Sequence, residues 1–194
     1  MTTTKNQMKE TKVVTGKVRF SYLHVWEPSA IEGSNEAKYS ASLIIPKSDK
    51  ATIQKIQNAI NSAISNGVMG KFQGKKPVSL KLPLRDGDAE RPDDEAYANS
   101  YFVNASCKTR PGVVDINRNP ILDQDEVYSG CFGVASITFY PFNVNGNKGI
   151  ACGLNHLMKL TDGEPLGGRT TAESDFAQIN ASDWGVEVEE DIFG

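Results

Sequence analysis

Residues 37–67, AKYSASLIIPKSDKATIQKIQNAINSAISNG, contain the two patterns that decide the predicted fold, a strand followed by a helix. In residues 37–46, apolar side chains alternate with polar ones, which is the pattern of a half-buried β-strand. The face expected to point into the core carries Tyr39, Ala41, Leu43 and Ile45. The face expected to point outward carries Lys38, Ser40 and Ser42.

A helix is predicted next, over about residues 49–66. Ser48 is a suitable N-cap, and Gly67 lies where a glycine commonly ends a helix. Between them, isoleucines recur at the spacing of one helical face, namely Ile53, Ile56, Ile60 and Ile64. This stripe requires an apolar surface, so the helix is expected to lie across the neighbouring strands.

Strand patterns continue on both sides of this unit. They occupy residues 13–26, 97–107, 112–116, 130–142 and 149–160, and an Asn-Gly hairpin signal lies within residues 143–149. Five or six strands with a single helix predict a mainly β protein, for which an OB-fold-like five-stranded barrel is favoured. A sandwich with an appended helix is an alternative that composition does not separate from it.

The 194 residues are expected to form one domain with two extensions. Residues 1–12 are predicted to be a flexible N-terminus, residues 13–168 the barrel, and residues 169–194 a linker with a disordered acidic tail. No apolar run approaches ~18 residues and the N-terminus is polar, so neither a membrane span nor a secretory signal is expected. We therefore expect a cytoplasmic protein. The three widely spaced cysteines predict neither a disulfide framework nor a zinc site.

The net charge of −3 is unevenly distributed along the chain. Residues 1–84 carry a net charge of +8, residues 85–95 carry −4, residues 96–169 are neutral, and residues 170–194 carry −7. A basic body with an acidic end is typical of proteins whose ligand is a polyanion.

No catalytic or metal site and no cofactor is predicted. Residues 115–126 have oxygens spaced as in an EF-hand loop, but Pro120 stands where that loop needs glycine, so a polar connection is favoured. The acids of residues 85–95 lack a lysine or histidine at a nuclease-like spacing, which favours a solvated loop. The only two histidines fall inside strand patterns, and no catalytic triad is expected.

Aromatic and basic side chains alternate on several predicted strands, which favours a groove for single-stranded nucleic acid. Unstacked bases stack on flat side chains at ~1–3 kcal/mol each, while cations follow the phosphates. The candidate contact residues are Lys17, Arg19, Tyr22, Trp26, Lys38, Tyr39, Phe102, Lys108, Arg110, Tyr140, Phe142 and Lys148. Each single aromatic among them also fits a place in the core.

Six blocks lie in order along residues 14–168: RFSYLHVWEP (19–28), KYSASLIIPKSD (38–49), PLRDGDAERPDDEAY (83–97), RPGVVD (110–115), YSGCFG (128–133) and NGNKGIACGLNHLMKLTDGEPLGG (145–168). Together they resemble a phage and prophage family of single-stranded DNA-binding proteins. The resemblance implies an OB fold, binding of single strands with little sequence preference, and a role in phage DNA replication or recombination in the bacterial host. The chain is also similar in plan to the single-stranded DNA-binding proteins of podophages.

The last twelve residues, DWGVEVEEDIFG, contain five carboxylates and no basic side chain. Beside a basic barrel, this tail is expected to compete with DNA for the groove and, once displaced, to bind phage or host replication and recombination proteins. Its candidate partner-binding residues are Asp183, Trp184, Glu187, Glu189, Glu190, Asp191, Ile192 and Phe193. Related proteins commonly end in an aromatic near the tip, whereas here Gly194 follows Phe193.

Two other functions stay open as alternatives, a non-catalytic phage protein-interaction module and, less favoured, a metal-dependent nuclease. No membrane partner is expected, and homodimer formation is left open.

Overall fold

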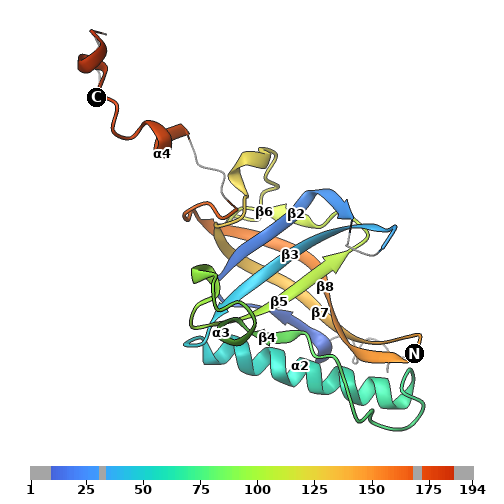
Figure 1. The fold of residues 1–194 in the computed structure, drawn as a ribbon. Helices are drawn as coiled ribbons and strands as arrows, with labels where there is room; N and C mark the ends of the chain where they lie inside the picture. Colours follow the sequence, from blue (N-terminus) through green and yellow to red (C-terminus); the bar gives the residue numbers. More distant parts are fainter. Residues whose placement is uncertain (1–9, 31–33, 168–171, 186–194) are drawn as a thin grey trace.

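The structure is a computed structural model that describes residues 10–30, 34–167 and 172–185 (Figure 1). Its strands are β1 (Lys12–Val14), β2 (Val18–Ala30), β3 (Ala37–Pro46), β4 (Leu84–Asp86), β5 (Ser100–Cys107), β6 (Gly112–Val114), β7 (Phe132–Val144) and β8 (Asn147–Thr161). Its helices are α2 (Lys50–Met69), α3 (Gly87–Glu90) and α4 (Ala172–Phe176), with short 3-10 turns η1 (Glu95–Tyr97), η2 (Gln124–Glu126) and η3 (Ala181–Trp184).

Five strands close into a ring in the order β2–β3–β5–β8–β7 and back to β2. Strands β2, β3 and β5 form an antiparallel meander, while β7 and β8 form a long hairpin. The hairpin joins the meander on one side through the antiparallel pair Val18↔Gly133 and on the other through the parallel pair Ser106↔Gly153. The predicted OB-fold-like five-stranded barrel with one main helix is therefore confirmed.

A β-bulge at Tyr22 exchanges the two faces of β2. Phe20 is fully buried before the bulge, whereas Val25, at an odd spacing from it, is fully buried after it. The backbone of Tyr22 has φ of 44°, and the pairing with β3 shifts between Ser21 and His24. An extra residue in one strand reverses the alternation beyond it. The bulge turns the Tyr22 and His24 side chains outward.

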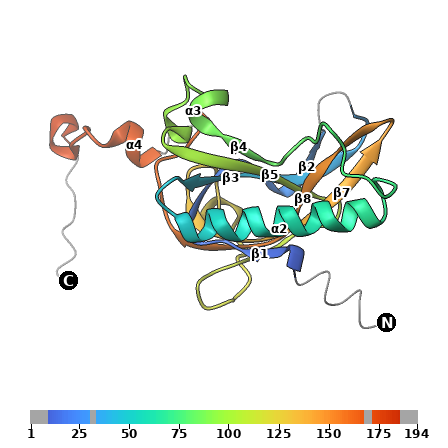
Figure 2. The same ribbon diagram turned by 90° about the horizontal axis from the view of Figure 1, so that it is seen from below.

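Helix α2 lies across one end of the ring and packs mainly against β7 and β1, as Figure 2 shows from below. Its buried face includes Ile53, Ile56 and Ile60. The N-cap is Asp49 and not the predicted Ser48, because the Asp49 carboxylate accepts hydrogen bonds from both the Thr52 N–H and the Thr52 hydroxyl. The helix extends to Met69, so Gly67 lies inside it, where an added Cβ would clash with the buried ring of Phe72.

The connection between α2 and β5 contains β4 and α3, which include part of residues 85–95, where the sequence favours a solvated loop. Strand β4 pairs with β5, and the residues that follow cover the outer face of β3 and β5. They bury a second apolar cluster of Ile44, Tyr97 and Phe102. The rings of Tyr97 and Phe102 meet edge to face at 5.1 Å between centroids. This connection therefore shapes one outer face of the ring.

Cys131 and Cys152 are buried thiols in the core, and Cys107 is a half-buried thiol at the end of β5. Burial raises the pKa of all three. None of the helices in the described part of the chain has both the length and the apolarity that a membrane span requires.

Candidate nucleic-acid interface

A groove opens where the ring separates into two arms. Beyond the Ser106↔Gly153 pair, the β2–β3 arm and the β7–β8 arm diverge on the same side of the ring, at the right in Figure 1. In chain order the five ring strands are β2, β3, β5, β7 and β8. The two arms therefore carry the connection from the first to the second strand and the connection from the fourth to the fifth. OB folds bind oligonucleotides near these two connections. The groove measures about 700 Å³ and is lined by Lys12, Ser106, Cys107, Lys108, Thr109, Arg110, Thr138, Tyr140, Gly153, Leu154, Asn155 and His156.

Cations stand on opposite sides of this groove. Lys12 on β1 lies opposite Thr138, while Lys108 and Arg110 follow the end of β5. The Lys108 ammonium lies 3.6 Å from the Glu36 carboxylate, but the two side chains are 72% and 60% exposed. An exposed pair at this distance contributes little, so the ammonium of Lys108 can exchange this partner for a phosphate.

Arg110 is held over the ring of Trp26. The guanidinium lies 5.3 Å from the ring centroid, within the range of a cation–π contact. The indole Nε1–H of Trp26 donates to the Val127 carbonyl at 3.2 Å, which fixes the ring. The positive charge of Arg110 is therefore oriented at the groove by a partly buried aromatic of the β2–β3 arm.

Lys38 and Tyr39 lie on the same arm and are half-buried. Tyr39 pairs with Cys107, directly before Lys108, and Lys38 pairs with Ser29. The arm therefore adds a second ring beside the end of β5, whereas Lys38 lies on the opposite face of β3, the face of Ser40, which lines a smaller groove on the outer side.

Tyr140, Phe142 and Lys148 lie on the β7–β8 arm. Tyr140 is 44% exposed, and burial of the rest raises the pKa of its hydroxyl, which stays neutral at physiological pH. Phe142 follows two residues later without a register shift and so shares the face of Tyr140. Lys148 pairs with Asn143 next to the hairpin turn. The structure thus places predicted contact residues of both arms at or beside one groove.

A second, smaller groove of about 240 Å³ lies on the outer face of β2, β3 and β5. Its lining includes the 55% exposed ring of Tyr22 and the side chain of Arg91. The Arg91 guanidinium lies 5.1, 4.8 and 5.2 Å from the ring centroids of Tyr22, Tyr97 and Phe102. It also donates a hydrogen bond of 3.3 Å to the Tyr22 hydroxyl.

Sequence reasoning did not select Arg91, because its acidic neighbours make residues 85–95 resemble a solvated loop. It also did not select Lys12, Asn155 or His156, which line the larger groove. Arg91 follows α3 in an acidic connection that has no periodic pattern, and only the packing of the 84–98 connection on β3 and β5 reveals its position.

Three predicted contact residues have structural partners elsewhere. Arg19 donates to the carbonyls of Gly130 at 3.0 Å and Glu164 at 2.7 Å, and Lys17 lies 5.0 Å from the Phe132 ring centroid. Lys17 directly precedes β2 and Arg19 is its second residue, at the end of the strand away from the β2–β3 connection. The ring of Phe102 is fully buried under the 84–98 connection, so a base would reach it only if that connection moved.

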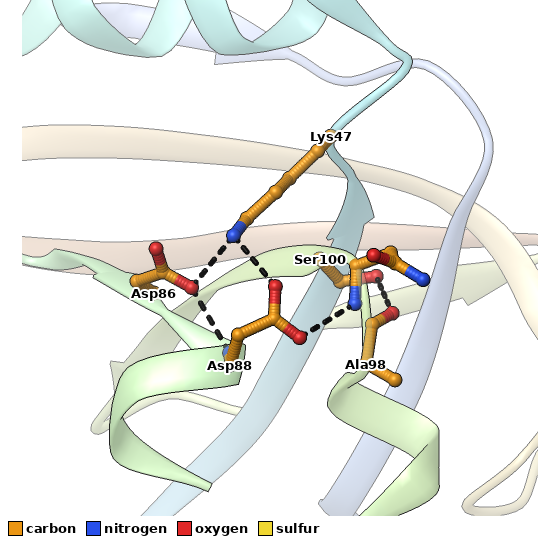
Figure 3. Close-up of polar contacts among 6 residues, drawn as sticks. Lys47, Asp86, Asp88, Ala98 and Ser100 are labelled. Atoms are coloured by element: carbon orange, nitrogen blue, oxygen red, sulfur yellow. Dashed lines mark hydrogen bonds and ion pairs between the residues drawn. The ribbon is translucent and has the colours of Figure 1, made fainter. Parts of the chain in front are cut away.

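The acids of residues 85–95 hold this connection in place (Figure 3). The Lys47 ammonium lies 2.9 Å from the Asp86 carboxylate and 2.7 Å from that of Asp88. Asp88 also accepts a hydrogen bond from the Asn99 N–H, and Asp86 one from the Asp88 N–H. The hydrogen bond from Lys47 is the main cause of the lowered pKa of both aspartates. In turn, the hydrogen bond to Asp88 is the largest cause of the raised pKa of Lys47, and the hydrogen bond to Asp86 is the second largest.

The second acidic segment, residues 115–126, forms a turn. Asp115 accepts hydrogen bonds from the N–H groups of Asn117 and Asn119, and Val114 bridges to Pro120. Among residues 10–30, 34–167 and 172–185, histidine, cysteine, aspartate and glutamate form no group of three that could hold a metal ion.

Only part of the predicted partner-binding tail falls within the described residues. Asp183 and Trp184 lie in η3 and are exposed, Trp184 to 74%. Outside the described residues lie Glu187, Glu189, Glu190, Asp191, Ile192 and Phe193.

Comparisons with known proteins agree on one group of relatives. Residues 11–190 match the model of the family described as "Enterobacter phage Enc34, ssDNA-binding protein". Protein p50 of Acyrthosiphon pisum secondary endosymbiont phage 1 is 30% identical over 184 residues, which cover 89% of this chain and 96% of that protein.

Two solved structures are also similar. The single-stranded DNA-binding protein from bacteriophage Enc34 in complex with single-stranded DNA is 28% identical, with a TM-score of 0.72 over 82% of this chain and 91% of that one. The single-stranded DNA-binding protein gp2.5 of bacteriophage T7 has a TM-score of 0.59 at 14% identity, covering 87% of this chain and 94% of that one. The second likeness concerns the fold alone.

Proposed function

Since this chain belongs to the family of the single-stranded DNA-binding protein of Enterobacter phage Enc34, we propose that the groove between its two arms is where it binds single-stranded DNA. The similar Enc34 protein was solved with single-stranded DNA. The observation that carries the assignment is the groove of about 700 Å³ lined by Lys12, Lys108, Arg110 and Tyr140 at the OB-fold ligand position.

The groove binds a strand through two kinds of contact. Lys108 and Arg110 attract phosphates, and the counterions released from the DNA drive much of the affinity. Tyr140, with Phe142 beyond it on the same arm, offers a ring on which an unpaired base can stack. Because every base has a flat face, this mode of binding has little sequence preference.

The test is the salt dependence of binding to an oligothymidine, measured by fluorescence anisotropy. Each phosphate contact contributes about 0.7 to the slope of log K against log salt for single strands, so Lys108→Gln/Arg110→Gln is expected to reduce the slope by about 1.4. The control is Lys50→Gln, which removes one charge from an exposed position at the start of α2, and its change in slope is compared per charge removed. A wild-type affinity that does not change with salt would contradict the model.

Trp26 provides an independent readout, because it lies directly under Arg110. In a Trp184→Phe background, DNA is expected to change the Trp26 fluorescence. Absence of both binding and fluorescence change would favour the protein-interaction alternative.

The protein acts without catalysis in this proposal. Asp86 and Asp88 are engaged by Lys47, and Asp115 accepts bonds from its own loop. Labelled single strands incubated with the protein and magnesium, manganese or calcium are expected to stay intact. Cleavage that disappears in Asp86→Asn/Asp88→Asn would instead support the nuclease alternative.

We place the protein in phage DNA replication or recombination in the host cytoplasm, with residues 13–168 as the binding domain and residues 169–194 as linker and tail. In this proposal the tail competes with DNA and binds a replication or recombination protein, for which its net charge of −7 over residues 170–194 is the support. A chain ending at Ser182 is expected to bind DNA equally or more tightly and to lose the protein partner. Weaker DNA binding by the shortened chain would rule out competition.

A further inference from the structure

The connection from α2 to β4 is the most basic exposed segment near the groove. It carries Lys71, Lys75, Lys76 and Lys81, and all four side chains are exposed. No aspartate or glutamate occurs between Asp49 and Asp86, so the segment has no acidic neighbour in sequence. In the described part of the chain, none of these four lysines has a carboxylate within ion-pair distance, whereas Lys47 has two, and Lys108 and Lys159 have one each.

Backbone pairing fixes this connection to the β7–β8 arm. Lys81 forms a parallel bridge with Gly149, in which the Lys81 N–H donates to the Lys148 carbonyl at 3.1 Å. The Ile150 N–H donates to the Lys81 carbonyl at 2.9 Å. At the start of the connection, the Asn143 amide donates to the Lys71 carbonyl at 3.2 Å. Both ends of the basic segment are therefore anchored to the arm that carries Tyr140.

The same pairing places Lys81 on the face of the groove. Gly149 pairs with Phe142 on one side and with Lys81 on the other, and side chains at paired positions share a face. Tyr140 lies one pair further along that face. The order on this surface is therefore Tyr140, then Phe142, then Lys81.

Gly149 allows these groups to approach one another. A Cβ at this position would lie 2.8 Å from the Phe142 ring and 2.5 Å from the Lys81 carbonyl oxygen. Without a side chain there, the ring lies over the strand and adjoins the basic connection. A strand that leaves the groove past Tyr140 and Phe142 would next meet exposed ammonium groups.

We propose that the α2–β4 connection is a second phosphate-binding segment, which contacts nucleotides that run out of the groove along the β7–β8 arm. The inference rests on the proposed function, because it extends the same DNA-binding site. Lys75, Lys76 and Lys81 contact phosphates there. The protein therefore binds long strands through more phosphates than the groove alone reaches.

The experiment compares a short and a long strand. An oligothymidine of about 6 nucleotides lies near the lower end of OB-fold site sizes, and one of about 20 exceeds the upper end. Lys75→Gln/Lys76→Gln is expected to bind the short strand as the wild type does. On the long strand it is expected to lose affinity, and its salt slope is expected to fall by about 0.7 per lost contact.

The control is again Lys50→Gln, compared per charge removed, since Lys50 lies at the far end of a 20-residue helix that is about 30 Å long. Equal thermal midpoints of all variants establish that folding is unchanged. Wild-type affinity of Lys75→Gln/Lys76→Gln for the long strand, or an equal loss in the control, would overturn the proposal and leave the proposed function standing. No wild-type binding to either strand would overturn the proposed function itself.

Discussion

Replacement of Tyr140 is the most direct test of base stacking in the groove. The Tyr140 ring is 44% exposed, and a Cβ built on Gly153 would lie 3.5 Å from it. One side of the ring therefore rests on the strand and the other is free for a single base. Loss of one stacked base costs ~1–3 kcal/mol. At about 1.4 kcal/mol per tenfold change, Tyr140→Ala is expected to weaken binding about 5-fold to 150-fold.

The assay is fluorescence anisotropy with the oligothymidine of about 6 nucleotides, which keeps binding within the groove. Tyr140→Phe retains the flat ring and is expected to bind within about twofold of wild type, because stacking does not use the hydroxyl. Phe176→Ala serves as the aromatic control, since Phe176 is 62% exposed in α4 and does not line the groove.

Two results would refute the reasoning. Wild-type binding by Tyr140→Ala would mean that no base rests on this ring. Equal losses in Tyr140→Ala and Tyr140→Phe would assign the effect to the hydroxyl, and stacking would be rejected. If Tyr140→Ala unfolds at a lower temperature than the wild type, binding is measured well below its thermal midpoint. Unfolding then does not contribute to the loss of affinity.

Two further predictions concern stability. Gly67→Ala is expected to destabilise the protein by up to about 2 kcal/mol, because the overpacking cost against Phe72 is about 1–3 kcal/mol and the helix-propensity gain is about 1 kcal/mol. Thermal unfolding measures the change, with Gly70→Ala, which meets no clash, as the control. Lys47 holds the pKa of its two aspartate partners low, so their contribution to stability is present above the unfolded value of 3.8 and is lost as pH falls through the folded values. The thermal midpoint of Lys47→Met is therefore expected to fall less than that of wild type between about pH 5 and about pH 2, and parallel curves would contradict the role of this ion pair.

Local patterns predicted most of the elements because each pattern has a single physical cause. Ile53, Ile56 and Ile60 recur at the period of a helix that buries one face, and the alternation of residues 37–46 is that of a strand with one buried face. The helix N-cap was predicted one residue early, because Ser48 and Asp49 both have a capping oxygen and only the position of Thr52 selects Asp49.

Alternation failed where an added residue changed its phase. Phe20 and Tyr22 share a face in a regular strand, but the bulge at Tyr22 turns its ring toward Arg91, while Phe20 stays in the core. A bulge with positive φ at a tyrosine has no sequence signal of the kind that glycine provides.

The sequence by itself determined the elements and the uneven charge, because periodicity, composition and net charge are properties of the chain before it folds. The class of ligand was indicated by the resemblance of six sequence blocks to a family of single-stranded DNA-binding proteins. Only the tertiary structure decided which aromatics face solvent and which cations meet at one groove. Phe102 and Tyr140 have equivalent strand patterns, yet the 84–98 connection buries the first and the arms expose the second. Burial depends on what packs over a face, and that is set by residues distant in sequence.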